Sequence, residues 1–155
     1  MFKNIADIRL PAPRTDEEAV YLGVPAGGSE LKLTDIEIPI LIVQLFDMYC
    51  TNCQREAPEV NRLYEQIQAS NLRGRVRFIG IGKGNSEMEA GIFRDRYGVP
   101  FPLFADPKKV NTKRLGVERT PNFVVVDMKR RKVVHQQWLL PSADALLEIV
   151  EGAAR

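Results

Sequence analysis

The sequence predicts a single α/β domain over residues 1–155, in which helices flank a central mixed β-sheet. With 45% hydrophobic residues, the chain can bury a core without help from metals or cross-links. Its longest apolar runs, residues 38–46 and 123–126, are far shorter than the roughly 20 residues of a membrane-spanning helix, so we interpret them as buried strands. Segments with the apolar spacing of helices alternate with the strand-like runs, as expected of an α/β protein.

The N-terminal part is predicted to begin irregularly and then to form a β-hairpin. Prolines and acidic residues interrupt any periodic pattern in residues 1–18, which we expect to be an irregular lead-in. Residues 19–24 and 30–33 can pair as two short strands. Gly27 and Gly28 would supply the positive dihedral angles of a tight turn between these strands.

The next segment predicts a β-α-β unit around two cysteines. Residues 41–46 are apolar and β-branched, which is typical of a strand buried on both faces. From Cys53 to about Ser70, apolar or small residues recur at the spacing of one helix face. Residues 75–81 alternate as a second strand. Cys50 is therefore expected at a turn between a strand and a helix.

An inserted α-β-α segment is expected over residues 86–116. Ser86-Glu-Met-Glu89 has the form of a capping box and predicts the start of a helix that runs toward Tyr97. A short strand is predicted over residues 103–105. Asp106-Pro107 then predicts a capping side chain before a proline at the first position of a brief helix.

The C-terminal part predicts two strands and a closing helix. The strands are expected over residues 122–127 and 132–138, joined by the charged turn 128–131. Residues 142–153 have the pattern of an amphipathic helix. The order of predicted elements is therefore that of a sheet covered by helices on both faces.

The motif Cys50-Thr-Asn-Cys53 carries the strongest chemical signal. At the N-terminus of a helix, unpaired backbone N–H groups and the positive end of the dipole stabilise a thiolate, which makes Cys50 the candidate nucleophile. Cys53 lies one helical turn further on, where it can attack a mixed disulfide and release the bound substrate. The motif therefore predicts a redox-active cysteine pair that needs no other cofactor.

Other interpretations of the cysteines fit less well. A structural zinc site needs about four ligands, whereas the chain offers two cysteines and one distant histidine, His135, so no metal is expected. A structural disulfide that closes so small a loop would stabilise the fold little. Inert core thiols would not require placement at a helix end.

Two further features exclude other classes of function. The net charge of +2 arises from 22 basic and 20 acidic residues spread along the chain, so nucleic acid is not an expected partner. The segment Gly80-Ile-Gly-Lys-Gly-Asn85 lacks the spacing and the Lys-Ser/Thr pair of a phosphate-binding loop, and we interpret it as a strand end followed by a loop.

The motifs together resemble the TlpA/ResA-like branch of the thioredoxin superfamily. Cys50-Thr-Asn-Cys53-Gln-Arg-Glu-Ala-Pro58 follows an apolar strand, and its Pro58 matches the proline that kinks the active-site helix in that superfamily. Thr120-Pro121 matches the cis-proline loop. The resemblance implies a thioredoxin fold, with residues 86–116 as the insertion typical of this branch.

The resemblance also implies roles for residues around the cysteines. Tyr49 stands where the family usually has tryptophan. Together with Thr120 and Pro121 it is expected to bind substrate. The Thr120-Pro121 bond is expected to be cis and to lie beside the cysteines. Glu56 matches an acidic residue behind the cysteines. Because Gln44 stands where thioredoxin has a buried aspartate, Glu56 is the candidate proton acceptor, and a surface glutamate paired with a neighbouring arginine is the alternative.

The function implied by the resemblance is a thiol-disulfide oxidoreductase that reduces protein disulfides. Its expected partners are disulfide-bearing proteins and a thiol electron donor such as a membrane thiol carrier, and the protein is expected to be a monomer. Relatives in this branch are extracytoplasmic, which favours the periplasm. Residues 1–14 contain no continuous apolar segment typical of a secretory signal, so a cytoplasmic location stays open.

Two alternatives share the predicted fold. Peroxiredoxins use it for peroxide reduction, but they have proline and threonine ahead of the peroxidatic cysteine, where this chain has Phe46, Asp47 and Tyr49. A non-enzymatic binding module would use the groove near Pro121 without any dependence on the thiols. Peroxide turnover and the thiol dependence of partner binding distinguish these alternatives.

Overall fold

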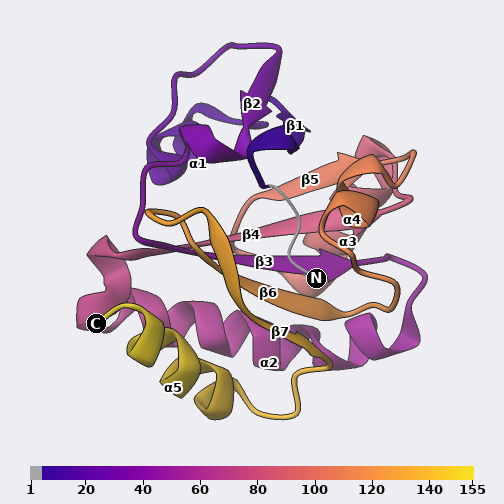
Figure 1. The fold of residues 1–155 in the computed structure, drawn as a ribbon. Helices are drawn as coiled ribbons and strands as arrows, with labels where there is room; N and C mark the ends of the chain where they lie inside the picture. The colour runs from indigo at the N-terminus through magenta and orange to yellow at the C-terminus, as the bar shows by residue number, and fades with distance from the viewer. Residues whose placement is uncertain (1–4) are drawn as a thin grey trace.

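The computed structural model describes residues 5–155 and contains a five-stranded and a two-stranded β-sheet (Figure 1). The five strands lie in the order β5-β4-β3-β6-β7, with β3, β4 and β5 parallel and β6 and β7 antiparallel to their neighbours. The elements in chain order are η1 (Ile5–Asp7), β1 (Arg9–Pro11), α1 (Asp16–Leu22), β2 (Glu30–Lys32), η2 (Leu33–Asp35), β3 (Ile40–Phe46), α2 (Thr51–Gln68), η3 (Asn71–Gly74), β4 (Val76–Lys83), α3 (Glu87–Tyr97), β5 (Leu103–Asp106), α4 (Val110–Arg114), β6 (Asn122–Asp127), β7 (Lys132–Trp138) and α5 (Ala143–Ala153).

Two apolar cores lie on the two faces of the large sheet. One face packs against α2, α3 and α5, and its strand residues include Ile42, Phe78 and Val125. The other face packs against the N-terminal segment and residues that follow α4, with Leu41 and Val43 among its strand residues. Figure 1 shows α2 and α5 on one side of the sheet, and β1, β2 and α1 on the other. The predicted class, a mixed sheet flanked by helices, is confirmed.

The predicted N-terminal hairpin is wrong. Residues 19–22 belong to α1, whose first turn is acidic and whose N-cap, Thr15, accepts a hydrogen bond from Glu18 N at 3.1 Å. These end signals favour a helix over a strand. The strand β2 instead pairs with β1, which lies within the predicted irregular lead-in. Residues 1–4 of that lead-in lie outside the described residues.

The inserted α-β-α segment is present as α3, β5 and α4, but the start of its second helix differs from the prediction. Asp106 ends β5 instead of capping the helix, which begins at Val110 after Lys109 in a left-handed conformation. The Asp106 carboxylate accepts hydrogen bonds from the backbone N–H groups of Asn111 and Thr112 at 3.2 and 2.8 Å. It therefore satisfies helix N–H groups from outside the helix.

Glycines in β4 make room for large side chains near the end of β3. A Cβ atom at Gly80 would lie 2.5 Å from Leu103 Cδ2, and one at Gly82 would lie 3.0 Å from Asn85 Cβ and 3.1 Å from Phe46 Cζ. Close packing at this end of the sheet thus requires glycine, which has no side chain, at both positions.

The two edges of the large sheet differ. β5 has four residues and lies near β1, whereas β7 has seven residues, in which exposed positions alternate with buried or half-buried ones. The pairing of β6 with β7 shifts register between Val125 and Val126. Within residues 5–155, no helix is both long and apolar enough to cross a membrane.

Candidate active site

Cys50 lies where the chain leaves β3 and enters α2. It is the N-cap of α2, and its Sγ accepts a hydrogen bond from Cys53 N at 3.2 Å. Both thiols are reduced in this structure, with Cys50 partly exposed and Cys53 fully buried. The predicted placement at a strand-to-helix turn is therefore confirmed. The Cys50 sulfur is therefore oriented toward the unpaired N–H groups at the start of α2.

The environment of Cys53 differs from that of Cys50. Burial raises the pKa of the Cys53 thiol far above its usual value, and a hydrogen bond with Cys50 raises it further, whereas the backbone of Asp47 and the side chain of Thr120 lower it. Cys53 therefore keeps its proton in the reduced protein. The exposed sulfur of the pair is the one at the helix end.

The loop before Cys50 is held by Asn85, which follows β4. The Asn85 side chain is buried, its Oδ1 accepts from Met48 N at 3.0 Å, and its Nδ2 donates to Asp47 Oδ1 at 3.0 Å. Gln54 Nε2 also donates to Met48 O at 2.7 Å. The sequence motifs did not identify Asn85 as a site residue. The feature that could have identified it is a polar residue just after a predicted strand. That strand is parallel and adjacent to the strand that leads to the cysteines.

Tyr49 lies on the exposed rim of the site, with 68% of its surface accessible. Its hydroxyl donates to Glu89 Oε2 at 2.6 Å, and Glu89 Oε1 accepts from Ser86 N in the capping box of α3. The hydrogen bond to Glu89 raises the pKa of Tyr49. Beside this rim lies a hollow of about 210 Å³ lined by Met48, Tyr49, Gln54, Ile92, Phe93, Arg96 and Tyr97.

Thr120 and Pro121 lie on the opposite side of Cys50 from Asn85, because β6 and β4 flank β3 on its two sides. The Thr120-Pro121 bond is cis, as predicted, and the Cys50 thiol donates to Thr120 O at 3.4 Å, which places the dipeptide beside the cysteines. Trp138 Nε1 donates to the same oxygen at 3.3 Å. The Arg119 guanidinium lies 4.0 Å from the centre of the Trp138 ring. No motif in the sequence places Trp138 at this site.

Glu56 is partly buried on α2 and contacts the segment after β7. Its Oε1 accepts from Leu140 N at 2.8 Å. Burial raises its pKa, while the Leu140 hydrogen bond and the charge of Arg55 lower it. Of the two arginines of α2 that could pair with Glu56, Arg55 and Arg62, the second forms an ion pair with Glu59 at 3.5 Å.

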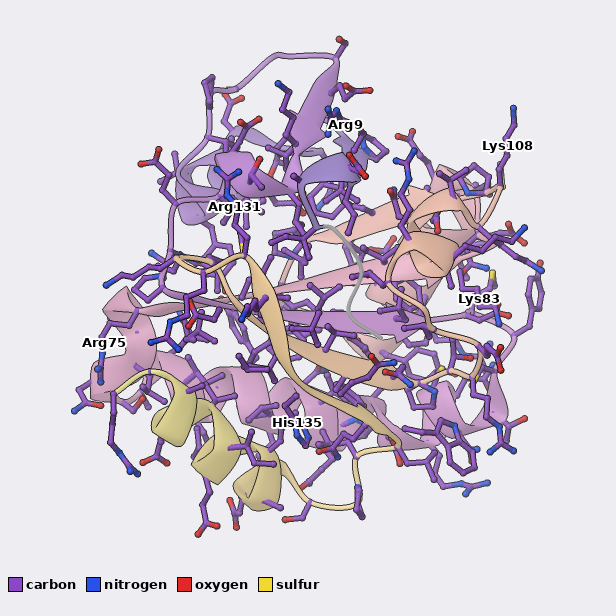
Figure 2. The ribbon with its side chains drawn as sticks, in the orientation of Figure 1. Arg9, Arg75, Lys83, Lys108, Arg131 and His135 are labelled. Atoms are coloured by element: carbon purple, nitrogen blue, oxygen red, sulfur yellow. The ribbon has the colours of Figure 1, made fainter. Side chains whose placement is uncertain are left out.

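No cluster of three or more metal-ligating side chains is found in residues 5–155. His135 lies on β7, where its Nε2 is 2.7 Å from Gln137 Oε1 (Figure 2). Figure 2 also shows Lys83 and Arg131 toward opposite ends of the large sheet. The site around Cys50 is at the Lys83 end, because β3 and β4 are parallel and both lead toward it.

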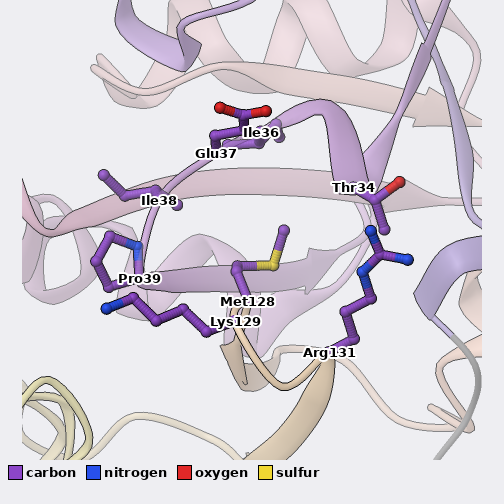
Figure 3. A pocket seen from close by; sticks show the side chains of 8 residues that line it. All are labelled: Thr34, Ile36, Glu37, Ile38, Pro39, Met128, Lys129 and Arg131. Atoms are coloured by element: carbon purple, nitrogen blue, oxygen red, sulfur yellow. The ribbon is translucent and has the colours of Figure 1, made fainter.

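A larger cavity, of about 400 Å³, lies away from the cysteines (Figure 3). It is formed where the chain enters β3 and leaves β6, and it combines an apolar floor with charged side chains from the turn before β7. Neither cysteine lines it. Its residues are Thr34, Ile36, Glu37, Ile38, Pro39, Met128, Lys129 and Arg131.

Comparison with known proteins connects this geometry to a family. The model of the AhpC/TSA family matches residues 10–136. The thiol-disulfide oxidoreductase ResA of Halalkalibacterium halodurans is 24% identical over 115 residues, which cover 74% of this chain and 63% of ResA. The match thus spans less than two thirds of that relative.

Solved structures have the same fold at low identity. A putative thiol:disulfide interchange protein DsbE from Chlorobium tepidum has a TM-score of 0.75 and 19% identity, with 99% of this chain and 96% of that chain covered. A secreted thiol-disulfide isomerase from Corynebacterium glutamicum has a TM-score of 0.72 and 20% identity, with coverages of 96% and 83%. The resemblance inferred from the motifs is confirmed.

Proposed function

This chain belongs to the AhpC/TSA family, and on that premise we propose that it is a thiol-disulfide oxidoreductase that reduces disulfides in other proteins. The observation that carries the proposal is the asymmetry of the cysteine pair. Cys50 Sγ is accessible and accepts a helix N–H, whereas Cys53 is fully buried one turn away. Reactive cysteines lie in such partly exposed, electropositive surroundings.

The reaction proceeds in two exchanges. The Cys50 thiolate attacks one sulfur of the substrate disulfide, so that a mixed disulfide forms and the other substrate sulfur leaves as a thiolate. Cys53 then loses its proton and attacks Cys50 Sγ, which releases the second substrate sulfur. Two electrons pass to the substrate, and the Cys50–Cys53 pair becomes a disulfide. A thiol electron donor must reduce this disulfide before the next cycle.

The second exchange requires that the proton of Cys53 be removed. Glu56 is the proposed acceptor, because partial burial raises its pKa and makes its carboxylate a better base than an exposed one. One of its oxygens accepts from Leu140 N, which fixes the orientation of the carboxylate. Tyr49, Thr120 and Pro121 form the surface on either side of Cys50 that we assign to the substrate.

The proposed partners follow from this chemistry. The substrates are proteins with accessible disulfides, and the electron donor is a thiol protein, for which a membrane thiol carrier is one source. We place the reaction outside the cytoplasm, since the isomerase from Corynebacterium glutamicum with this fold is described as secreted. We propose that the protein acts as a monomer.

Two cysteine variants test the proposal, and each is the control of the other. With insulin as the disulfide substrate, Cys50→Ser should abolish reduction because the attacking sulfur is lost. Cys53→Ser should accumulate mixed disulfides with insulin, visible on non-reducing gels, because the resolving thiol is lost. Equal trapping by both variants would contradict the assignment. Peroxide consumption without insulin reduction would indicate a peroxidase instead.

A further inference from the structure

Trp138 is placed at the cysteine site by contacts that the proposed reaction does not use. It is the only tryptophan in the chain and the last residue of β7. Its indole N–H donates to Thr120 O, and Arg119 lies over its ring. The side chain is nevertheless 41% exposed, which is unusual for so large an apolar surface. An exposed aromatic ring beside a reactive sulfur is available to a binding partner.

The backbone after Trp138 holds the indole in this position. Leu139 has a φ of 73°, a left-handed conformation that side chains with a Cβ rarely adopt. Leu139 N donates to Pro121 O at 3.0 Å, and Leu140 N donates to the Glu56 carboxylate. The chain around Trp138 is therefore fixed both to the cis-proline loop and to α2.

The Thr120 carbonyl oxygen is fully occupied in the reduced protein. A carbonyl oxygen has two acceptor positions, and here one takes the Cys50 thiol and the other takes the Trp138 indole. When Cys50 loses its proton it can no longer donate, so the position on its side becomes free. The indole N–H still fills the other position.

We propose that Trp138 is a substrate-positioning residue. Its N–H restricts the Thr120 carbonyl to a single open acceptor position, on the Cys50 side, where the amide of an extended substrate binds next to the attacking sulfur. Its ring, together with Arg119, supports the substrate chain. This inference rests on the proposed function, with an extended substrate pairing with the Thr120 backbone, and adds Trp138 as the residue that leaves one acceptor position open. A disulfide without a peptide backbone therefore gains nothing from Trp138.

Fluorescence tests substrate binding directly, because all tryptophan emission comes from Trp138. Insulin has no tryptophan, and the Cys50→Ala protein binds it without reacting and leaves the Cys50-side acceptor position open. We expect a saturable change in Trp138 emission as insulin is added. Emission that does not respond to insulin would overturn the proposal.

Kinetics test the positioning role. Trp138→Phe keeps a ring but lacks the N–H, so both acceptor positions are open and some insulin binds unproductively. We expect kcat and KM for insulin to fall together by several-fold, and the kcat ratio of insulin to hydroxyethyl disulfide to fall as well. The matched control is Val134→Ala, an exposed apolar residue on the same strand, which should keep the wild-type ratio.

The outcomes separate this inference from the proposed function. If Trp138→Phe keeps the wild-type kcat ratio of insulin to hydroxyethyl disulfide, the positioning role is wrong, even where both kcat values fall. If the wild-type protein reduces neither insulin nor hydroxyethyl disulfide, the proposed function itself fails. Because the fluorescence experiment retains Trp138, it remains decisive even where a Trp138 variant does not fold.

Discussion

The two sides of Cys50 are held in different ways. On the side of α3, Asn85 makes two hydrogen bonds of 3.0 Å to the loop before the cysteine, and it is buried. On the side of the cis-proline, the Thr120 carbonyl accepts hydrogen bonds from the Cys50 thiol and the Trp138 indole, at 3.4 and 3.3 Å, and Trp138 is exposed.

This difference separates two requirements of a thiol exchange site. A nucleophile must be held in position before the substrate arrives, and buried hydrogen bonds do this because their loss leaves polar groups unpaired. The surface that receives the substrate must instead exchange its hydrogen bonds with those of the substrate. Hydrogen bonds at a partly exposed carbonyl suit that purpose.

The largest effect on stability is expected from removing Asn85, which holds the loop before Cys50. Asn85→Ala removes the partners of Met48 N and of the Asp47 carboxylate, and we expect it to lower the free energy of unfolding by about 1–3 kcal/mol. Insulin reduction should slow as well, because the loop before Cys50 loses its anchor. Urea unfolding and initial exchange rates measure the two effects.

A surface amide provides the matched control for Asn85. Gln136→Ala changes an exposed position of β7, and its free energy of unfolding should stay within about 0.5 kcal/mol of the wild-type value. Equal stabilities of the Asn85→Ala and Gln136→Ala proteins would show that the loop before Cys50 is not held by Asn85.

A smaller effect, dependent on pH, is expected at Glu56. Because burial raises its pKa above the ordinary 4.5, the folded protein binds more protons at this site than the unfolded chain, and its contribution to stability is lost as the pH rises through the folded pKa. Glu56→Gln stays neutral and keeps an acceptor oxygen for Leu140 N. Its stability relative to the wild type should therefore increase from acidic to neutral pH in urea titrations.

The same substitution distinguishes two roles of Glu56 in exchange. If Glu56 accepts the Cys53 proton, Glu56→Gln slows the resolution of the mixed disulfide. If Glu56 only anchors Leu140, Glu56→Gln exchanges at the wild-type rate and Glu56→Ala is slower. Rapid-quench measurements of the mixed disulfide separate these outcomes, and a wild-type rate for Glu56→Gln would withdraw the proton-acceptor role.

The smallest effect on stability is expected on the cis-proline side of Cys50. Arg119→Gln removes the cation over the Trp138 ring, an exposed contact worth no more than about 1 kcal/mol. The emission of Trp138 should change while the urea midpoint moves little. If this variant is as unstable as Asn85→Ala, both sides of Cys50 are equally fixed and the comparison fails.

Elements with a strong local pattern could be predicted from the sequence. The strand before Cys50, the helix after it and the capping box at Ser86 and Glu89 each depend on residues close together in the chain. The predicted N-terminal hairpin is wrong because the glycine pair at 27–28 suggests a turn between two strands, whereas Thr15 caps a helix over residues 16–22. Partner strands of the N-terminal sheet are also separated by a helix, which local patterns do not reveal.

The candidate site divides in the same way. Cys50, Cys53 and the cis bond at Pro121 were predicted because each belongs to a short motif. Asn85 and Trp138 come from other segments and reach the site only through the sheet, which joins β4 to β3 and β7 to β6. No spacing in the sequence shows that these two side chains lie on the two sides of Cys50.

The exposed edge of β7 has a consequence for self-association. An unpaired edge strand can add a strand from another molecule, and proteins prevent this with charged or polar side chains and with bulges. β7 has exposed Lys132 and Gln136, and its pairing with β6 shifts register between Val125 and Val126. The strand that carries Trp138 to the cysteines is therefore also protected against edge-to-edge aggregation, without a helix that would cover the surface proposed to bind substrate.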